Sequence, residues 1–343
     1  MLFKRTALVA IALSALALAL PTTAGAQPDA EAIEYLNDED LSGPTRGDGR
    51  YSRLGIESTL NFVSNDNVIG QNDGTSIHVG GGLDGGLDFI RGDHALRNTL
   101  TYNTSWSRTP ALETFIKNND AVDAESIYNY YLTDWAGPYA RVSVETSALP
   151  TNQRTADAKD YRINFEDGTS QLDATDNLRL ADPFRPISFF ESVGATLEPV
   201  NDEAIRTTFR LGFGARQTLA SGVLDITDDT NDDGEVIVNE LRNAIQAGAE
   251  AFAGVQGAFP ERRVNYRAGA TALLPFINND DTDRSAFDLA RIGFTAQVRM
   301  DLFSWMGFTY RASLLNDPQL LDSAQIQNSF LLTFNYTLTD AGE

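Results

Sequence analysis

The sequence predicts an all-β protein, a transmembrane antiparallel up-and-down β-barrel of about 12 strands with short turns at one end and long acidic loops at the other. Three observations support this prediction. Apolar and polar residues alternate with a period of two in about a dozen segments, which is typical of strands with one apolar and one polar face. The connections alternate between short and long, and aromatic residues gather near the segment ends. Both features are typical of outer-membrane barrels.

Residues 1–26 have the composition of a secretory signal peptide. Two basic residues form a positively charged start, an apolar run follows over 7–20, and Ala-Gly-Ala precedes the expected cleavage site. The apolar run is shorter than the roughly 20 residues that a helix needs to cross a bilayer, which argues against an uncleaved anchor. We expect Sec-dependent export to a Gram-negative outer membrane, a disordered periplasmic segment over 27–50 and a barrel over 51–339.

The alternation is clearest over residues 206–216. Phe209 and Leu211 lie on one face of the expected strand, and Arg210 and Arg216 lie on the other. The same pattern recurs along the chain and predicts twelve strands: 52–64, 76–91, 95–107, 124–134, 138–147, 185–198, 204–217, 243–259, 262–276, 287–302, 305–314 and 326–338.

One of these segments, 243–259, also fits a helix that has Ile245 and Phe252 on one face. Gly248 and Gly254 argue against the helix, because each glycine costs a helix roughly 1 kcal/mol relative to alanine. Without this segment the number of strands would also be odd. We therefore interpret it as a strand.

The connections fall into two classes. The short ones contain the segments GDHA, WAGP, PVNDE, FPER and LFSW. An even number of strands places both chain ends on the short-turn side, which we expect to face the periplasm, while the long loops lie outside the cell. These long connections are polar and acidic: roughly 65–75, 108–123, 148–184, 218–242, 277–286 and 315–325.

Composition excludes several classes of function. The chain has 48 Asp and Glu against 26 Lys and Arg, whereas nucleic-acid binding needs a basic surface. It has no cysteine, so we expect no disulfide, thiol nucleophile or lipoprotein anchor. His78 is expected to face the lumen and His94 to lie in a short turn, so neither matches the outward Ser–His pair of outer-membrane phospholipases. Outer-membrane aspartyl proteases pair Asp with His at the barrel rim, and nothing in the sequence selects such a pair among the many loop Asp residues. We expect no catalytic residue and no enzyme, with an outer-membrane hydrolase as a second alternative.

The polar faces of the expected strands are rich in arginine and carry acids as well. We expect one positive and one negative wall, a transverse field that suits passive diffusion of small polar solutes with a preference for anions. The alternative is a lumen filled by Arg–carboxylate pairs, which makes a non-conducting barrel with a surface-binding or structural role. The residues expected in the lumen are Arg141, Arg206, Arg210, Arg216, Arg267, Arg291, Arg299, Arg311, Asp84, Asp88 and Glu250.

One long loop has the spacing of a twelve-residue calcium loop. Counting from Asp229, side chains that can bind calcium are Asn231, Asp233 and Glu240, and Glu235 offers its backbone carbonyl. Calcium is therefore the one cofactor that the sequence predicts. An acidic surface turn is the alternative, because Asp, Asn and Gly also dominate turns. Acidic loops of this kind can also share divalent ions with neighbouring lipopolysaccharide phosphates.

Two segments, 180–202 and 300–321, resemble a group of uncharacterised outer-membrane barrel proteins that is known only as a domain of unknown function. The resemblance implies a barrel that is located in the outer membrane, with lipid and lipopolysaccharide around it. It implies no activity. The last expected strand has Phe330, Phe334 and Tyr336 on one face. It resembles the C-terminal strand that the outer-membrane assembly machinery recognises, although it lacks a terminal Phe and TDAGE follows it.

Overall fold

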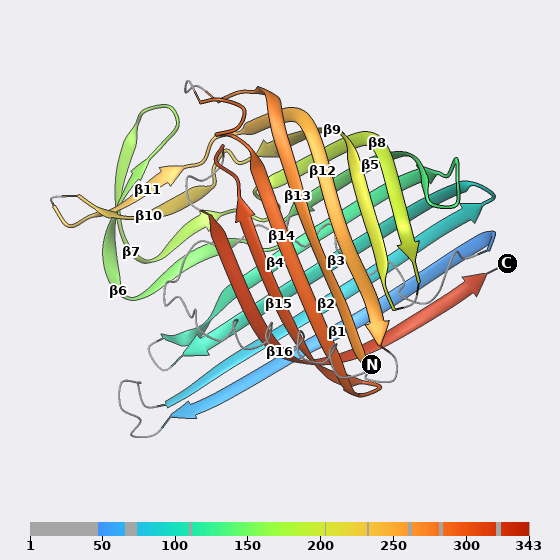
Figure 1. Ribbon diagram of the computed structural model, residues 1–343. Helices are drawn as coiled ribbons and strands as arrows, with labels where there is room; N and C mark the ends of the chain where they lie inside the picture. The colour runs from blue at the N-terminus through green and yellow to red at the C-terminus, as the bar shows by residue number, and fades with distance from the viewer. Residues whose placement is uncertain are drawn as a thin grey trace, which may run out of the picture.

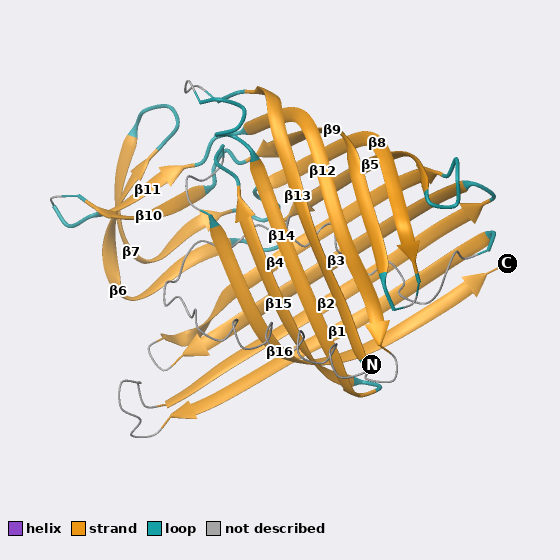
Figure 2. Cartoon of the chain, viewed as in Figure 1, coloured by secondary structure: helices purple, strands orange, loops and turns teal. Residues whose placement is uncertain are grey.

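The computed structural model describes residues 47–65, 74–109, 112–202, 204–231, 233–259, 263–280, 284–319 and 324–342. All elements in these ranges are strands (Figure 2). No helix in this part of the chain is long and apolar enough to cross a membrane. The expected signal peptide and most of the expected periplasmic segment lie outside the described residues, so both stay predictions.

Twelve strands close into one antiparallel barrel, which confirms the predicted fold class (Figure 1). Each of the twelve predicted strands has its counterpart, including the one that also fitted a helix. The barrel strands are β1 (Gly49–Asn65), β2 (Gly74–Arg91), β3 (His94–Thr109), β4 (Leu112–Tyr130), β5 (Ala136–Thr146), β8 (Ile187–Asn201), β9 (Arg206–Leu219), β12 (Ala244–Phe259), β13 (Val264–Asn278), β14 (Arg291–Phe303), β15 (Met306–Asn316) and β16 (Gln325–Gly342).

The ring closes where the first and last strands meet. β1 pairs with β16 in antiparallel register from Arg50↔Gly342 to Thr59↔Thr333. Closure leaves no open edge, so every strand has hydrogen-bonded neighbours on both sides. A backbone that is surrounded by lipid requires this, because no water is present to bond its N–H and C=O groups. The start of β1 and the end of β16 lie on the short-turn side, as the even strand count predicts.

β9 illustrates why these residues form barrel strands. Leu211 and Phe213 are 59% and 68% exposed on the outer face, whereas Arg210 and Arg216 on the inner face are 6% and 2% exposed. A water-soluble protein would bury the apolar set instead. An apolar exterior around a polar interior is the arrangement that a lipid environment favours.

Two of the long connections contain structure that the sequence did not predict. Segments within 148–184 and 218–242 form four strands outside the ring, in the order β10-β11-β6-β7 (Figure 1). The central pair, β11 and β6, is parallel, with Val238 opposite Ile163. We refer to these strands as the outer sheet: β6 (Thr151–Asn164), β7 (Ser170–Ala181), β10 (Leu224–Thr230) and β11 (Val236–Glu240).

The outer sheet has its own small core and a fixed attachment to the barrel. Tyr161, Leu178 and Val238 are buried against one another. At the attachment, Lys117 of β4 donates to Asp120, to the Leu149 carbonyl and to Thr151, over 3.0, 2.9 and 2.9 Å. These contacts hold the start of β6 against the barrel wall.

The expected connection over 108–123 is a further difference. β3 runs to Thr109 and β4 starts at Leu112, so most of the segment is strand rather than loop. The acidic and amide side chains of this segment obscure the alternation of apolar and polar residues. A register shift in the pairing of β3 with β4, between Ser105 and Trp106, also interrupts the alternation. The barrel wall is therefore taller at this point than the sequence predicted.

Glycine allows a close approach of β8 and β9. Gly194 and Gly212 lie opposite each other in this pair. A Cβ atom at Gly194 would lie 2.2 Å from the Leu211 carbonyl oxygen, and one at Gly212 would lie 2.1 Å from that of Val193. Any side chain at either position would push the two strands apart.

We predict that Leu211→Arg lowers the free energy of unfolding in lipid vesicles by about 2–4 kcal/mol, because an arginine at mid-depth faces hydrocarbon. Leu172→Arg is the matched control, since Leu172 is 49% exposed but lies in the outer sheet. Its effect should stay within about 0.5 kcal/mol. Urea unfolding of both variants measures the difference, and equal effects would contradict a lipid-facing Leu211.

Candidate functional site

The residues that the sequence predicts for the lumen all lie on the inner face of the barrel strands, opposite the exposed apolar side chains. Their charges must be compensated within the ring, because bulk water does not reach the buried ones. The buried ones are Arg141, Arg210, Arg216, Arg291 and Glu250. The half-buried ones are Arg206, Arg267, Arg299, Arg311, Asp84 and Asp88.

Arg141 forms the centre of the most enclosed part of the interior. Its Nε donates to Glu125 Oε2 over 2.6 Å, and its Nη1 lies 3.7 Å from Glu250 Oε1. The guanidinium carbon also lies 4.6 Å from the ring centroid of Phe190. Tyr139 donates its hydroxyl to Glu250 Oε2 over 3.2 Å. β4, β5, β8 and β12 are thereby joined through the lumen.

A second arginine extends this packed region. The guanidinium carbon of Arg210 in β9 lies 4.7 Å from the ring centroid of Phe252 in β12. A cation above an aromatic face gains electrostatic attraction, and more so when both are shielded from water. We call the residues around Arg141 and Arg210 the packed sector. They fill the lumen beside β5, β8, β9 and β12.

Asp317 directly follows β15. It contacts side chains of three other strands near the end of the barrel that carries the long connections. It forms ion pairs with Arg216 of β9 and, over 3.3 Å, with Arg291 of β14. Gln246 of β12 donates to its other carboxylate oxygen over 3.4 Å. Asp317 is 1% exposed, so this carboxylate is enclosed and paired.

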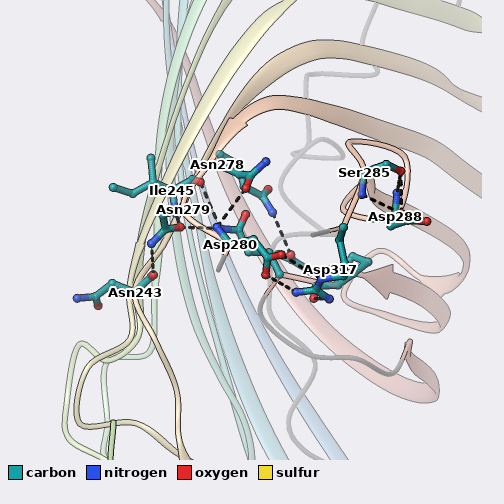
Figure 3. A network of polar contacts seen from close by, with 12 residues as sticks. Asn243, Ile245, Asn278, Asn279, Asp280, Ser285, Asp288 and Asp317 are labelled. Carbon is teal, nitrogen blue, oxygen red and sulfur yellow. Dashed lines mark hydrogen bonds and ion pairs between the residues drawn. The ribbon is translucent and has the colours of Figure 1, made fainter. Parts of the chain in front are cut away.

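The same end holds a polar network between connections, which Figure 3 shows from close by. Asn279 accepts from the Ile245 amide and donates to the Asn243 carbonyl, both over 2.8 Å. Arg284 forms an ion pair with Asp280 and donates to the carbonyl of the residue after Asp317, over 2.8 Å. These contacts tie the described residues on both sides of this connection to the start of β12 and to the residues after β15.

A polar cavity of about 260 Å³ lies between the walls formed by β1–β4 and by β13–β15. One side contributes Glu57, His78 and Asn103, and the other contributes Arg267 and Arg311. Pockets for drug-sized ligands span roughly 300–1,000 Å³, so this volume suits a smaller molecule. We call it the lumen cavity.

Positive charge outweighs negative charge around the lumen cavity. Glu57 pairs with Arg311 over 3.1 Å and with Arg299 over 3.6 Å, so two guanidinium groups share one carboxylate. Arg267 donates twice to the side-chain oxygen of Gln297, over 2.6 and 3.2 Å. Arg299 also pairs with Asp301, over 2.7 Å. Among the residues that line the cavity, Arg267 and Arg311 outnumber Glu57, which leaves an excess of positive charge.

The expected negative wall is neutralised locally. Asp84 of β2 forms an ion pair with Arg53 of the neighbouring β1, over 2.9 Å. Asp84 therefore does not face the arginines across an open lumen. The transverse field stays a prediction, and this pair reduces the contribution of Asp84 to it.

The two histidines lie apart. His78 Nδ1 is 3.2 Å from Asn118 Nδ2 at the lumen cavity. His94 Nδ1 is 2.6 Å from the Tyr128 hydroxyl near a short turn. These contacts form neither a Ser–His nor an Asp–His pair.

The structure separates the residues of the predicted calcium loop. Asn231 Oδ1 accepts from the amides of Asp233 and Glu235 over 3.1 and 2.9 Å, which closes a tight turn. Glu240 lies at the far end of β11, where it accepts from the amides of Gly222 and Glu166 over 2.7 and 3.1 Å.

β11 is the physical reason for this separation. Its five residues are extended at about 3.3 Å each, whereas a calcium loop has to fold its twelfth residue back to the ion. Asp229 lies on the neighbouring β10. No group of three or more acidic or histidine side chains among the described residues is arranged to hold a metal. Calcium binding stays a prediction.

Several interior residues escaped the sequence analysis. Glu125, Tyr139 and Asp317 complete the contacts of the predicted arginines, yet none stands out in the sequence. Asp317 lies in an acidic connection, and only the fold distinguishes it from the other loop acids. The one signal in the sequence was the alternation along its strand, which places Glu125 on the inner face.

Comparisons with known proteins show no family for this chain. No family model matches the chain, and no curated protein matches it. The translocator domain of the autotransporter NalP from Neisseria meningitidis is 11% identical, with 89% of this chain and 92% of that chain covered and a TM-score of 0.38.

Two channels from Pseudomonas putida give similar values. An outer-membrane channel from strain F1 is 11% identical over 88% of this chain and 99% of that chain, with a TM-score of 0.38. The toluene transporter TodX is 9% identical over 86% and 91%, with a TM-score of 0.36. Such loose overlaps carry no argument about what this chain transports or binds.

We predict that Arg141→Ala lowers the free energy of unfolding by about 3–5 kcal/mol, because it leaves Glu125 and Glu250 as buried carboxylates without their cation. Arg179→Ala is the control, since Arg179 forms an ion pair with Asp182 but its side chain is 60% exposed. It should cost no more than about 1 kcal/mol. Urea titration in vesicles compares them, and a small effect of Arg141→Ala would contradict the enclosed cluster.

A second prediction concerns pH and the outer sheet. Hydrogen bonds from Arg162 and Asn231 lower the pKa of Glu235. Because the pKa of Glu235 is lower in the folded state than in the unfolded state, its ionised carboxylate stabilises the sheet at pH values above the unfolded-state pKa. This stabilisation is lost as the pH falls through the folded-state pKa. Amide-exchange protection of β6 and β11 should therefore fall between neutral pH and about pH 3, below the usual Glu pKa. In Arg162→Gln, protection should be low at neutral pH already; unchanged protection there would contradict the prediction.

Proposed function

We propose that this protein is an outer-membrane channel of low conductance for small polar solutes, with a preference for anions. The observation that supports it best is the lumen cavity, where Arg267 and Arg311 outnumber Glu57 among the lining residues. Guanidinium groups present planar donors to carboxylate and phosphate oxygens. Amide and hydroxyl side chains on the opposite side supply hydrogen bonds to a polar solute in place of water.

The packed sector explains why a low conductance is expected. Arg141, Glu250 and Phe190 fill the lumen beside β5, β8 and β12, so the free cross-section is limited to the side of β1–β4 and β13–β15. A twelve-stranded barrel lies between small barrels filled by side chains and wide porins. A solute would therefore travel along the positive side of the lumen.

A second candidate is a non-conducting barrel that binds a partner at its outer surface. The polar network around Asp317 and Asn279, together with the packed sector, favours this alternative because both reduce the open section. The outer sheet supplies a folded structure on which binding could take place.

We also propose where the protein is located in the cell and what surrounds it there. Export would follow Sec recognition of residues 1–26, and β16 would be the strand that the assembly machinery recognises. The outer sheet and the long connections would face lipopolysaccharide. We also keep the relation to the uncharacterised barrel family as a proposal, and no enzymatic step is part of it.

Single-channel recording in planar bilayers tests the proposal. We predict small, discrete steps and a reversal potential that indicates anion preference under a salt gradient. The double variant Arg267→Gln/Arg311→Gln should move the reversal potential towards cations, because it removes two positive charges from the lumen cavity. Arg91→Gln, an exposed arginine at the end of β2, is the control and should leave selectivity unchanged.

The outcomes separate the two candidates. Folded protein that shows no steps at any voltage would contradict the channel and favour the surface-binding barrel. Steps with cation preference that the double variant does not alter would contradict the role of the arginines.

A further inference from the structure

Glu191 in β8 breaks the pattern of the barrel exterior. Its neighbours Phe190 and Ser192 are buried on the inner face, whereas Phe189, Glu191 and Val193 are exposed on the outer face. The outer-face positions of β5, β8, β9 and β12, all within the described residues, carry no other charged side chain. A single carboxylate on an otherwise apolar exterior is a departure that packing alone does not explain.

Glu191 lies within the apolar band rather than at its edge. Towards the long connections, Phe189, Leu219 and Ile245 are exposed beyond it. Towards the short turns, Val193 and Phe213 are exposed. An ionisable group surrounded in this way by apolar side chains at membrane depth costs free energy unless a partner compensates it.

The carboxylate lies in a hollow of the outer wall of about 670 Å³. Strand register explains the hollow. Glu191 is opposite Ala215, Ala215 is opposite Ala247, and Ala247 is opposite Ile277, so two small side chains stand in a row between larger ones. The rings of Tyr128, Phe213 and Phe276 line the same hollow.

The part of the chain that the structure describes offers Glu191 no partner. None of the described residues forms a hydrogen bond or an ion pair with its carboxylate. The compensating group must therefore come from outside the chain and must reach a site that is bordered by apolar walls.

We propose that this hollow binds a membrane-dissolved amphiphile whose ammonium group pairs with Glu191 and whose hydrocarbon chain lies over Ala215 and Ala247. A carboxylate beside aromatic rings is the chemistry that recognises amines and quaternary ammonium groups, because the faces of the rings attract the cation as well. The site lies on the outside of the wall and does not depend on the proposed channel.

A second copy of the chain fits the hollow less well. In a two-fold contact through this face, Glu191 would lie near Glu191 of the other copy, and like charges in apolar surroundings repel each other. A neutral lipid chain would fill the space but leave the carboxylate uncompensated. The charge therefore favours a cationic amphiphile.

Native mass spectrometry in a non-ionic detergent tests the inference, with dodecyltrimethylammonium as the probe and dodecanol as its uncharged counterpart. We expect one saturable site for the ammonium compound and weaker binding of the alcohol. Glu191→Gln should weaken ammonium binding about tenfold, a change of the size expected for losing one charge-assisted contact. Gln217→Ala, at an exposed outer-face position outside the hollow, is the control and should leave binding unchanged.

A further variant distinguishes the contribution of the Glu191 charge from that of the volume of the hollow. Ala247→Leu keeps Glu191 but fills the hollow, so binding of both probes should fall; Ala215→Leu serves if that variant does not fold. Equal ammonium binding by wild type and Glu191→Gln would overturn the proposal. A dimer that Glu191→Gln disrupts would also overturn it, in favour of a second copy.

Discussion

Arg141 lies fully inside the strand ring, held between Glu125 and Glu250 and against the face of Phe190. The constraint behind this contact shapes the whole barrel. A closed ring with an apolar exterior turns most charged side chains of its strands inward, away from bulk water. Buried charges must then pair with one another, because leaving one alone costs several kcal/mol. Where arginines and carboxylates match, as around Arg141, the lumen is packed.

Where the charges do not match, the lumen stays open. At β13–β15, Arg267 and Arg311 line the lumen cavity, and Glu57 is the one acid among its lining residues. The interior therefore has two parts that differ in charge balance. The outer wall has the reverse feature, a lone carboxylate in apolar surroundings. Each imbalance marks a place where a group from outside the chain can compensate the charge.

The sequence was sufficient to predict the barrel strands and the direction of their side chains. In β9, the alternation of Leu211 and Arg210 depends only on local periodicity, and lipid outside the ring determines which face is apolar. Partners across the lumen could not be predicted, because Arg216 and Asp317 are 101 positions apart and only the ring closure brings them together.

Long-range pairing explains both the unpredicted outer sheet and the geometry of the segment that matches a calcium loop. β6 and β11 pair in parallel across a long stretch of chain, so neither segment reveals its partner locally. The spacing from Asp229 to Glu240 matches a calcium loop in sequence, but pairing with β6 extends β11 and moves Glu240 away. The local spacing therefore did not predict where Glu240 lies, and calcium binding itself stays a prediction. Glu191 is different, since its place on an apolar face was visible in the sequence and only the hollow around it was not.

Cysteine labelling tests most directly whether the interior is divided into a packed and an open part. The chain has no cysteine, so a single substitution gives one thiol. Ser313 lines the lumen cavity, and Ser143 is 4% exposed beside Arg141 on the inner face of β5. The account predicts that Ser313→Cys reacts rapidly with a small charged thiol reagent in the folded protein, while Ser143→Cys reacts only after unfolding. Equal reactivity of the two positions in the folded barrel would contradict it.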